Sequence, residues 1–297
     1  MRANIKISPL EKDLILAHVL KKSREYVLTH PEHKLTKNQS ARRALLVSRR
    51  LKGEPLAYIL GHKEFYGLNF IVNENVLVPR PETELIIDHV THNIKHETSI
   101  NTAIVDVGTG SGCIIITLAE ILNTKYQIPN TKFIATDISA AALSVAKKNA
   151  RLHGLDKQIK FFRGNLLGPI LKSLPCRQAG KILNLKSKII ITANLPYGWK
   201  AWKNNCSQDS IGLKFEPPVA LYTGKNGLQL YEKLLKQIAI LASNYKKDIT
   251  CFFEFDPRQT VMLKKLIKKY LPDSRAEIKK DLRGHSRLLI ISFRQPA

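Results

Sequence analysis

Residues 106–112 read Asp-Val-Gly-Thr-Gly-Ser-Gly and close an apolar run that begins at Ala103. Glycines at these positions permit a tight turn and let a ligand approach the backbone N–H groups closely. The next apolar run ends in Ala135-Thr136-Asp137, where a carboxylate can accept the two hydroxyls of a ribose. A glycine turn followed by an acid at this spacing predicts a nucleotide-like cofactor at one edge of a sheet.

Apolar strands and amphipathic helices alternate outward from this turn, which is typical of an α/β protein with a mostly parallel sheet covered on both faces. The irregular, basic stretch 165–187 interrupts the alternation and is predicted to be a loop insertion. The predicted strands are 103–107, 132–136, 159–162, 188–192, 249–255 and 287–293, and the predicted helices are 111–122, 139–153, 227–242 and 259–270.

The N-terminal part follows another rhythm. Residues 9–62 place apolar side chains at helical spacing, with breaks at Pro31 and at Gly53-Glu54-Pro55, and predict a small bundle of short helices. Residues 64–72 predict two strands that turn near Gly67 or at 73–75, and a helix is expected from Pro81. We therefore expect a helical domain over 1–63, a β-hairpin linker over 64–80 and a second domain over 81–297.

The charge balance is unusual, with 48 Lys and Arg against 24 Asp and Glu, a net charge of +24. The excess is spread along the chain and favours polyanionic surroundings such as RNA or ribosomes, although a biased codon usage would give the same composition. The four cysteines lack CxxC spacing and nearby His pairs, so neither a zinc site nor a disulfide framework is expected. No signal peptide and no apolar run of ~20 residues is visible, and the expectation is a cytoplasmic protein without membrane contact.

Asn194-Leu195-Pro196-Tyr197 follows the predicted strand 188–192. An amide or exocyclic amine nitrogen is a poor nucleophile, and a site can help by accepting both of its N–H bonds. The Asn194 side-chain oxygen and the Leu195 carbonyl oxygen can do this, Pro196 stiffens the turn, and Tyr197 can pack against a planar acceptor. The alternative is an Asx-type turn that merely ends a strand.

The spacing of the glycines indicates which cofactor binds. Gly-x-Gly-x-Gly after Asp106, without GxGxxG and without a P-loop, indicates S-adenosylmethionine rather than NAD. Gly108, Thr109, Gly110, Ser111, Gly112, Asp137 and Asn194 are the candidate cofactor residues. No general base and no metal is expected, because Asp88, His89 and His92 lie on a predicted helix and are read as a solvated face.

The chain resembles the HemK/PrmC family of peptide-release-factor glutamine N5-methyltransferases over nearly its whole length. The resemblance is carried by the stretches 53–61, 64–67, 78–84, 106–112, 215–217, 220–221, 227–228 and 281–287, and by Asp137, Asn194, Pro196, Tyr197 and Glu254.

The resemblance implies a Rossmann-like class I methyltransferase sheet with a small N-terminal helical domain joined by a β-hairpin. It implies methyl transfer from S-adenosylmethionine to the N5 amide nitrogen of the glutamine in the Gly-Gly-Gln loop of release factors. The helical domain would help to hold the release factor, Asn194, Pro196 and Tyr197 would be catalytic, and Asn194 to Tyr197 would bind the glutamine.

Two positions depart from the family pattern. Leu195 stands where the family usually has a first proline, so the carbonyl acceptor is kept and a rigid ring is lost. Asn165 stands where an aspartate is usual, and its amide oxygen can still accept a hydrogen bond from the adenine amine.

Three other functions remain open at this point. A ribosomal-protein glutamine is a related substrate, although the spelling of 79–84 favours release factors. The motif Asn-Leu-Pro-Tyr is also similar to that of rRNA adenine N6-dimethylases. The net charge would also suit a non-enzymatic RNA- or ribosome-binding module.

Overall fold

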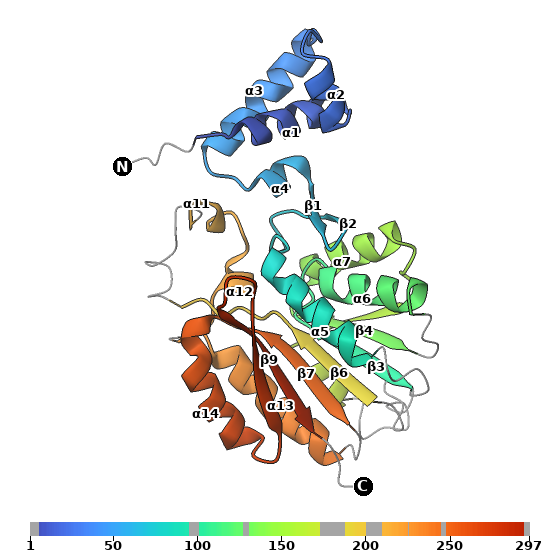
Figure 1. Cartoon of the computed structure of the whole chain (residues 1–297), viewed down its shortest axis with the longest axis vertical. Coiled ribbons are helices and arrows are strands. Elements are labelled where there is room, and N and C mark those ends of the chain that lie inside the picture. Colours follow the sequence, from blue (N-terminus) through green and yellow to red (C-terminus); the bar gives the residue numbers. More distant parts are fainter. Residues whose placement is uncertain are drawn as a thin grey trace.

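The computed structural model describes residues 6–94, 101–126, 131–172, 188–199, 210–224, 226–244 and 248–293. Its main feature is a seven-stranded sheet with the strand order β5-β4-β3-β6-β7-β9-β8 (Figure 1). The strands from β5 to β7 run parallel, and β9 and β8 are antiparallel. The strand bounds are β3 Thr102–Val107, β4 Lys132–Asp137, β5 Ile159–Arg163, β6 Lys188–Ala193, β7 Ile249–Glu254, β8 Arg275–Lys280 and β9 Ser286–Phe293.

Strands β3, β6 and β7 are buried at every residue, as expected for parallel strands covered on both faces. One core cluster packs α8, α13 and α14 on one face, and a second packs α5, α6 and α7 on the other. Figure 1 shows the two helical layers on either side of the sheet. The helices are α5 Glu84–Ile94, α6 Cys113–Thr124, α7 Ala140–Leu152, α8 Gly168–Lys172, α13 Gln229–Asn244 and α14 Thr260–Tyr270, with the shorter η1 Pro81–Thr83, α11 Ser210–Leu213, α12 Pro218–Leu221 and η2 Pro257–Gln259.

From residue 6 to the hairpin, the described chain forms four helices: α1 Pro9–Leu20, α2 Arg24–Thr29, α3 Lys37–Leu51 and α4 Leu56–Leu60. Capping boxes start α1 at Ser8 and α3 at Thr36. These helices have their own small core of Ile15, Val19, Leu46 and Ile59. They lie apart from the sheet at the top of Figure 1.

A hairpin of β1 His62–Phe65 and β2 Leu68–Ile71 follows. It turns at Tyr66-Gly67, both at positive φ (51° and 76°), so the first of the two predicted turn positions is correct. Tyr58 of α4 packs against the segment after the hairpin and against α7, and its hydroxyl donates to the Val76 carbonyl oxygen. The domain boundaries at 63/64 and 80/81 stay predictions.

The predicted strands and long helices are all present, within a few residues at their ends, but β8 was not predicted. Its sequence, Arg-Ala-Glu-Ile-Lys-Lys, is charged because the strand lies at the sheet edge and is mostly exposed. Of the predicted insertion, Gly168–Lys172 forms α8, and residues 173–187 lie outside the described residues, as do Cys176 and Cys206. Within the described ranges, no helix is long and apolar enough to cross a bilayer.

Candidate active site

The carboxyl ends of β3, β4 and β6 meet at one edge of the sheet, where parallel α/β sheets bind their ligands. A cavity lies there. Of the predicted site residues, its lining includes Gly108, Thr109, Gly110, Ser111, Asp137, Asn165, Asn194, Leu195 and Pro196. Gly112 caps α6 next to it. The structure therefore brings the predicted cofactor and acceptor residues together.

The turn after β3 needs its glycines for two reasons. Gly108 and Gly110 have positive φ (71° and 56°), which L side chains rarely adopt. A Cβ on Gly108 would lie 2.8 Å from Leu195 Cδ2, whereas the space beside Gly110 is open. The glycine turn and the Asn194 loop are thus in direct contact, and Gly110 leaves room for a ligand.

Asp137, at the end of β4, accepts N–H bonds from Gly110 (2.9 Å) and Ser139 (2.8 Å), one on each oxygen. Each carboxylate oxygen keeps a further acceptor position, so ribose hydroxyls can still bind. Burial raises the pKa of Asp137, and the backbone N–H donors act in the opposite direction.

Asp106 lies beneath the turn and is fully buried. Its two oxygens accept the hydroxyls of Thr109 (2.6 Å) and Thr192 (2.8 Å), which ties β3 to the glycine turn and to β6. Burial raises the pKa of Asp106 to about 6, and the charge of Asp137 adds to the rise.

Asn194 leaves the end of β6 and donates its amide nitrogen to Thr83 Oγ1 at 2.9 Å. Thr83 comes from η1, before the sheet begins, and also lines the cavity. Its hydroxyl donates to Glu254 Oε2 at 2.6 Å. The candidate acceptor-binding amide is therefore held by a residue that lies 111 positions earlier in the sequence.

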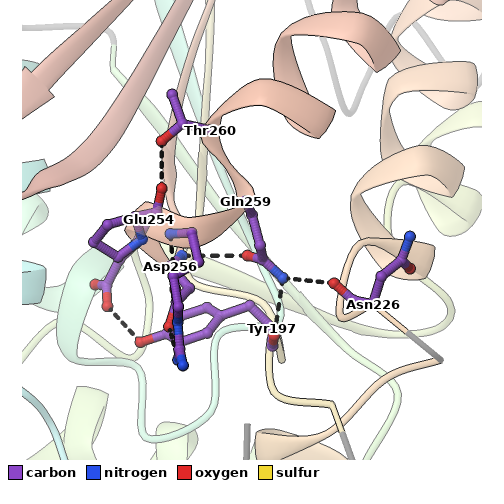
Figure 2. Close-up of polar contacts among 8 residues, drawn as sticks. Tyr197, Asn226, Glu254, Asp256, Gln259 and Thr260 are labelled. Atoms are coloured by element: carbon purple, nitrogen blue, oxygen red, sulfur yellow. Dashed lines mark hydrogen bonds and ion pairs between the residues drawn. The ribbon is translucent and has the colours of Figure 1, made fainter. Parts of the chain in front are cut away.

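Glu254 ends β7 and is almost completely buried behind the Asn194 loop. Its other oxygen accepts the Tyr197 hydroxyl at 3.1 Å (Figure 2). The Tyr231 hydroxyl donates to the Glu254 carbonyl oxygen and accepts the Leu195 N–H at 3.3 Å. Burial raises the pKa of Glu254, while the Thr83 donor and the Arg287 charge act in the opposite direction.

Gln259 completes this support. Its amide nitrogen donates to the carbonyl oxygens of Tyr197 (3.0 Å) and Asn226 (2.9 Å), as Figure 2 shows. Gly227, at φ 72°, lies so close to the Tyr197 backbone that a Cβ on it would be 2.0 Å from the Tyr197 carbonyl oxygen. The Tyr197 hydroxyl points inward to Glu254, and its ring packs against the core. The predicted packing of this ring against a methyl acceptor stays a prediction.

The linker before the sheet forms another wall of the cavity, through Asn75, Val76 and Arg80 among others. The buried Glu216 side chain accepts the Val78 N–H at 3.0 Å and pairs with Arg80. This contact fastens the segment 210–224 to the linker. Asn165, on the opposite side, is exposed and presents its side chain at the cavity rim.

Comparisons with known proteins show which family the chain belongs to. A family model described as the PrmC N-terminal domain matches residues 1–61, and a methyltransferase domain model matches residues 98–183. The release factor glutamine methyltransferase of Mycoplasma mycoides is 34% identical over 97% of this chain and 94% of its own length. That of Staphylococcus aureus is 32% identical over 94% of this chain and 90% of its own. The chain belongs to the release factor glutamine methyltransferase family.

The fold is found more widely than this family. The N-terminal domain of human METTL16 in complex with SAH has a TM-score of 0.51 to this chain, with 17% sequence identity over 94% of each chain. At this identity the likeness concerns the fold alone, and it confirms the predicted Rossmann-like methyltransferase sheet.

Tyr231 and Gln259 were not predicted as parts of this candidate site, and Thr83 and Glu254 were noted only among the residues that carry the family resemblance. One signal was available in the sequence. Glu254 ends a predicted strand, as do Asp106, Asp137 and Asn194, and the carboxyl ends of parallel strands share one edge of the sheet. A charged residue at such an end is a candidate for the site.

Proposed function

We propose that this protein transfers a methyl group from S-adenosylmethionine to the side-chain amide nitrogen of the glutamine in the Gly-Gly-Gln loop of a peptide chain release factor. The observation that carries the proposal is the Asn194 carboxamide, held at the rim of the cavity next to the glycine turn. Membership of the release factor glutamine methyltransferase family supplies the substrate class.

The residues present fit the cofactor. Gly110 leaves open space where a Cβ would stand, and the Gly108 backbone can approach a ligand closely. Gly108 to Gly112 would hold the methionine part, Asp137 the ribose and Asn165 the adenine. When bound, S-adenosylmethionine supplies an electrophilic methyl group on a sulfonium.

The role of the Asn194 loop follows from the chemistry of an amide. A carboxamide nitrogen has a delocalised lone pair and is a poor nucleophile. The Asn194 side-chain oxygen and the Leu195 carbonyl oxygen would accept its two N–H bonds and aim the lone pair across the cavity. Pro196 would fix this turn, and Tyr197 would hold its outer end.

A methylation assay with two matched controls tests this function. The protein, S-adenosylmethionine and a purified release factor should give one added methyl group, which mass spectrometry maps to the loop glutamine. A release factor with that glutamine changed to alanine should gain none. Asn194→Ala should lower kcat by about 100-fold or more, because it removes an acceptor needed in the transition state.

Methyl groups found on rRNA or on a ribosomal protein, with none on the release factor, would overturn the proposal in favour of those substrates. Weak association with RNA or ribosomes, expected from the net charge of +24, stays a prediction. Such binding should weaken steeply as salt is raised. A cytoplasmic location and the holding of the release factor by α1–α4 likewise stay predictions.

A further inference from the structure

We propose that Thr83 and Glu254 are positioning residues that fix which end of the Asn194 carboxamide faces the methyl acceptor, and thereby select an amide over a carboxylate. The proposal rests on the proposed function, since it concerns how the same site tells its substrate from a close analogue. Neither residue needs to touch the substrate.

The single proton of the Thr83 hydroxyl sets the orientation of the Asn194 carboxamide. A hydroxyl carries one proton, and that of Thr83 is directed at Glu254 Oε2, 2.6 Å away. The Thr83 oxygen can then only accept a bond from Asn194, 2.9 Å away. This requires the amide nitrogen of Asn194 to face Thr83.

The nitrogen and the oxygen of a carboxamide are nearly equal in size, so their neighbours decide which end points where. With the nitrogen committed to Thr83, the Asn194 oxygen is left for the ligand in the cavity. The site therefore presents an acceptor, which suits the N–H bonds of a glutamine.

Glu254 keeps this polarity from reversing. The Thr83 and Tyr197 donors and the charge of Arg287 favour the ionised form of Glu254 and act against the effect of burial on its pKa. The ionised carboxylate has no proton to give, and its second oxygen accepts the Tyr197 hydroxyl at 3.1 Å. The group is 2% exposed, so water has little opportunity to replace either donor. The hydroxyl protons of Thr83 and Tyr197 consequently both point toward the Glu254 carboxylate.

The same arrangement works against a carboxylate in the substrate position. An oxygen of glutamate facing the Asn194 oxygen would place two acceptors together with no proton between them, and a site that leaves polar groups unpaired discriminates strongly. If the Asn194 carboxamide could flip, its NH₂ group would donate a hydrogen bond to the carboxylate. The preference for glutamine over glutamate would then fall.

Thr83→Val and Thr83→Ser form the matched test. Valine keeps the shape and loses the hydroxyl, whereas serine keeps the hydroxyl. Each enzyme is assayed with the release factor, and again with the same factor carrying glutamate in place of the loop glutamine as a competitive inhibitor.

Wild type and Thr83→Ser should turn over the glutamine factor and be inhibited weakly by the glutamate factor. Thr83→Val should lose about tenfold in kcat, and the glutamate factor should inhibit it about five- to tenfold better relative to the KM of the glutamine factor. The Kd for S-adenosylmethionine should change little. On an Asn194→Ala background, Thr83→Val should have no further effect on inhibition.

A merely structural role for Thr83 would alter the melting temperature without changing the preference between the two factors. Should Thr83→Val fail to fold, Thr83→Ala is expected to show the same shift in preference. Equal preference in the wild type, Thr83→Val and Thr83→Ser would overturn the proposal. A wild-type enzyme that does not methylate the release factor would instead refute the proposed function.

Discussion

Asn149 on α7 holds Ser111 of the glycine turn through a hydrogen bond from its side-chain amide to the Ser111 carbonyl oxygen (2.8 Å). The same amide exchanges two hydrogen bonds with the Ile71 backbone, at 2.7 and 3.0 Å, and the residue is fully buried. One side chain therefore joins the end of the hairpin to the cofactor turn.

Asn149→Ala should leave three backbone groups without this partner. We expect a loss of about 2–4 kcal/mol in the free energy of unfolding and weaker cofactor binding, since unsatisfied buried polar groups are costly. Urea denaturation and calorimetry measure the two effects. Asn123→Ala is the control, because its exposed bond to Gln158 should matter by less than about 0.5 kcal/mol.

Gly227→Ala should impair the site through Tyr197. Gly227 has φ 72°, and the Cβ of an alanine there would lie 2.0 Å from the Tyr197 carbonyl oxygen. Gly284→Ala is a close control, since Gly284 has φ 82° and no atom within 4 Å of its Cβ.

Both variants carry the cost of a left-handed alanine, about 1–2 kcal/mol. Gly227→Ala alone should also lower methyl transfer, because the clash displaces the loop that carries Asn194. Similar losses of activity in the two variants would show that the contact with Tyr197 has no special role.

Asp106→Asn should change how stability depends on pH. The pKa of Asp106 is raised from an ordinary value near 4 to about 6 in the folded protein. The folded state thus holds the proton more tightly, so wild type should lose stability as the pH rises from about 4 to about 6.

Asparagine does not titrate, and it removes this part of the loss. Between about pH 4 and pH 6, the free energy of unfolding of the variant should rise relative to that of wild type by up to about 3 kcal/mol, at 1.4 kcal/mol per pKa unit. The gain is superimposed on a pH-independent penalty, because an amide cannot accept both threonine hydroxyls. Denaturation curves at several pH values test this, and a constant difference between the two proteins would contradict it.

Glu216→Ala should loosen the linker wall of the cavity. The substitution would leave the buried Val78 N–H without its acceptor and remove the partner of Arg80. We expect the free energy of unfolding to fall by about 3–5 kcal/mol. Cofactor affinity should fall as well. Glu277→Ala breaks the exposed pair with Lys279 and should cost about 1 kcal/mol or less.

The sequence predicted what depends on local pattern. The buried strands are continuous apolar runs, so the parallel strands of the sheet were predicted correctly. The glycine turn and the acid that follows it lie within 32 residues of sequence, and the structure places both at the predicted edge of the sheet. The strand β8 was missed because an exposed edge strand has no apolar alternation to mark it.

The support of Asn194 could not be predicted in the same way. Thr83 and Glu254 are 171 residues apart, and their contact exists only once η1 has packed against the end of β7. The Leu195 N–H, which a proline would lack, is taken up by the Tyr231 hydroxyl on α13, another contact made by tertiary packing alone. The candidate ligand-binding residues form recognisable sequence motifs, whereas the contacts that hold them in place depend on tertiary packing.

The linker wall has a consequence for protein engineering. Residues 75–83 reach from the hairpin to the back of the Asn194 amide, so a shortened enzyme that starts at the first strand of the large sheet would lack part of its own active site. The hairpin must stay as well, because Phe65 and Phe70 belong to the core of the sheet and Ile71 is bonded to Asn149. A chimera that exchanges the helical N-terminus for another recognition module should therefore place its junction ahead of His62, where β1 begins. Cut there, the recipient keeps the hairpin, Thr83 and the wall intact, and only the helices α1–α4 are exchanged.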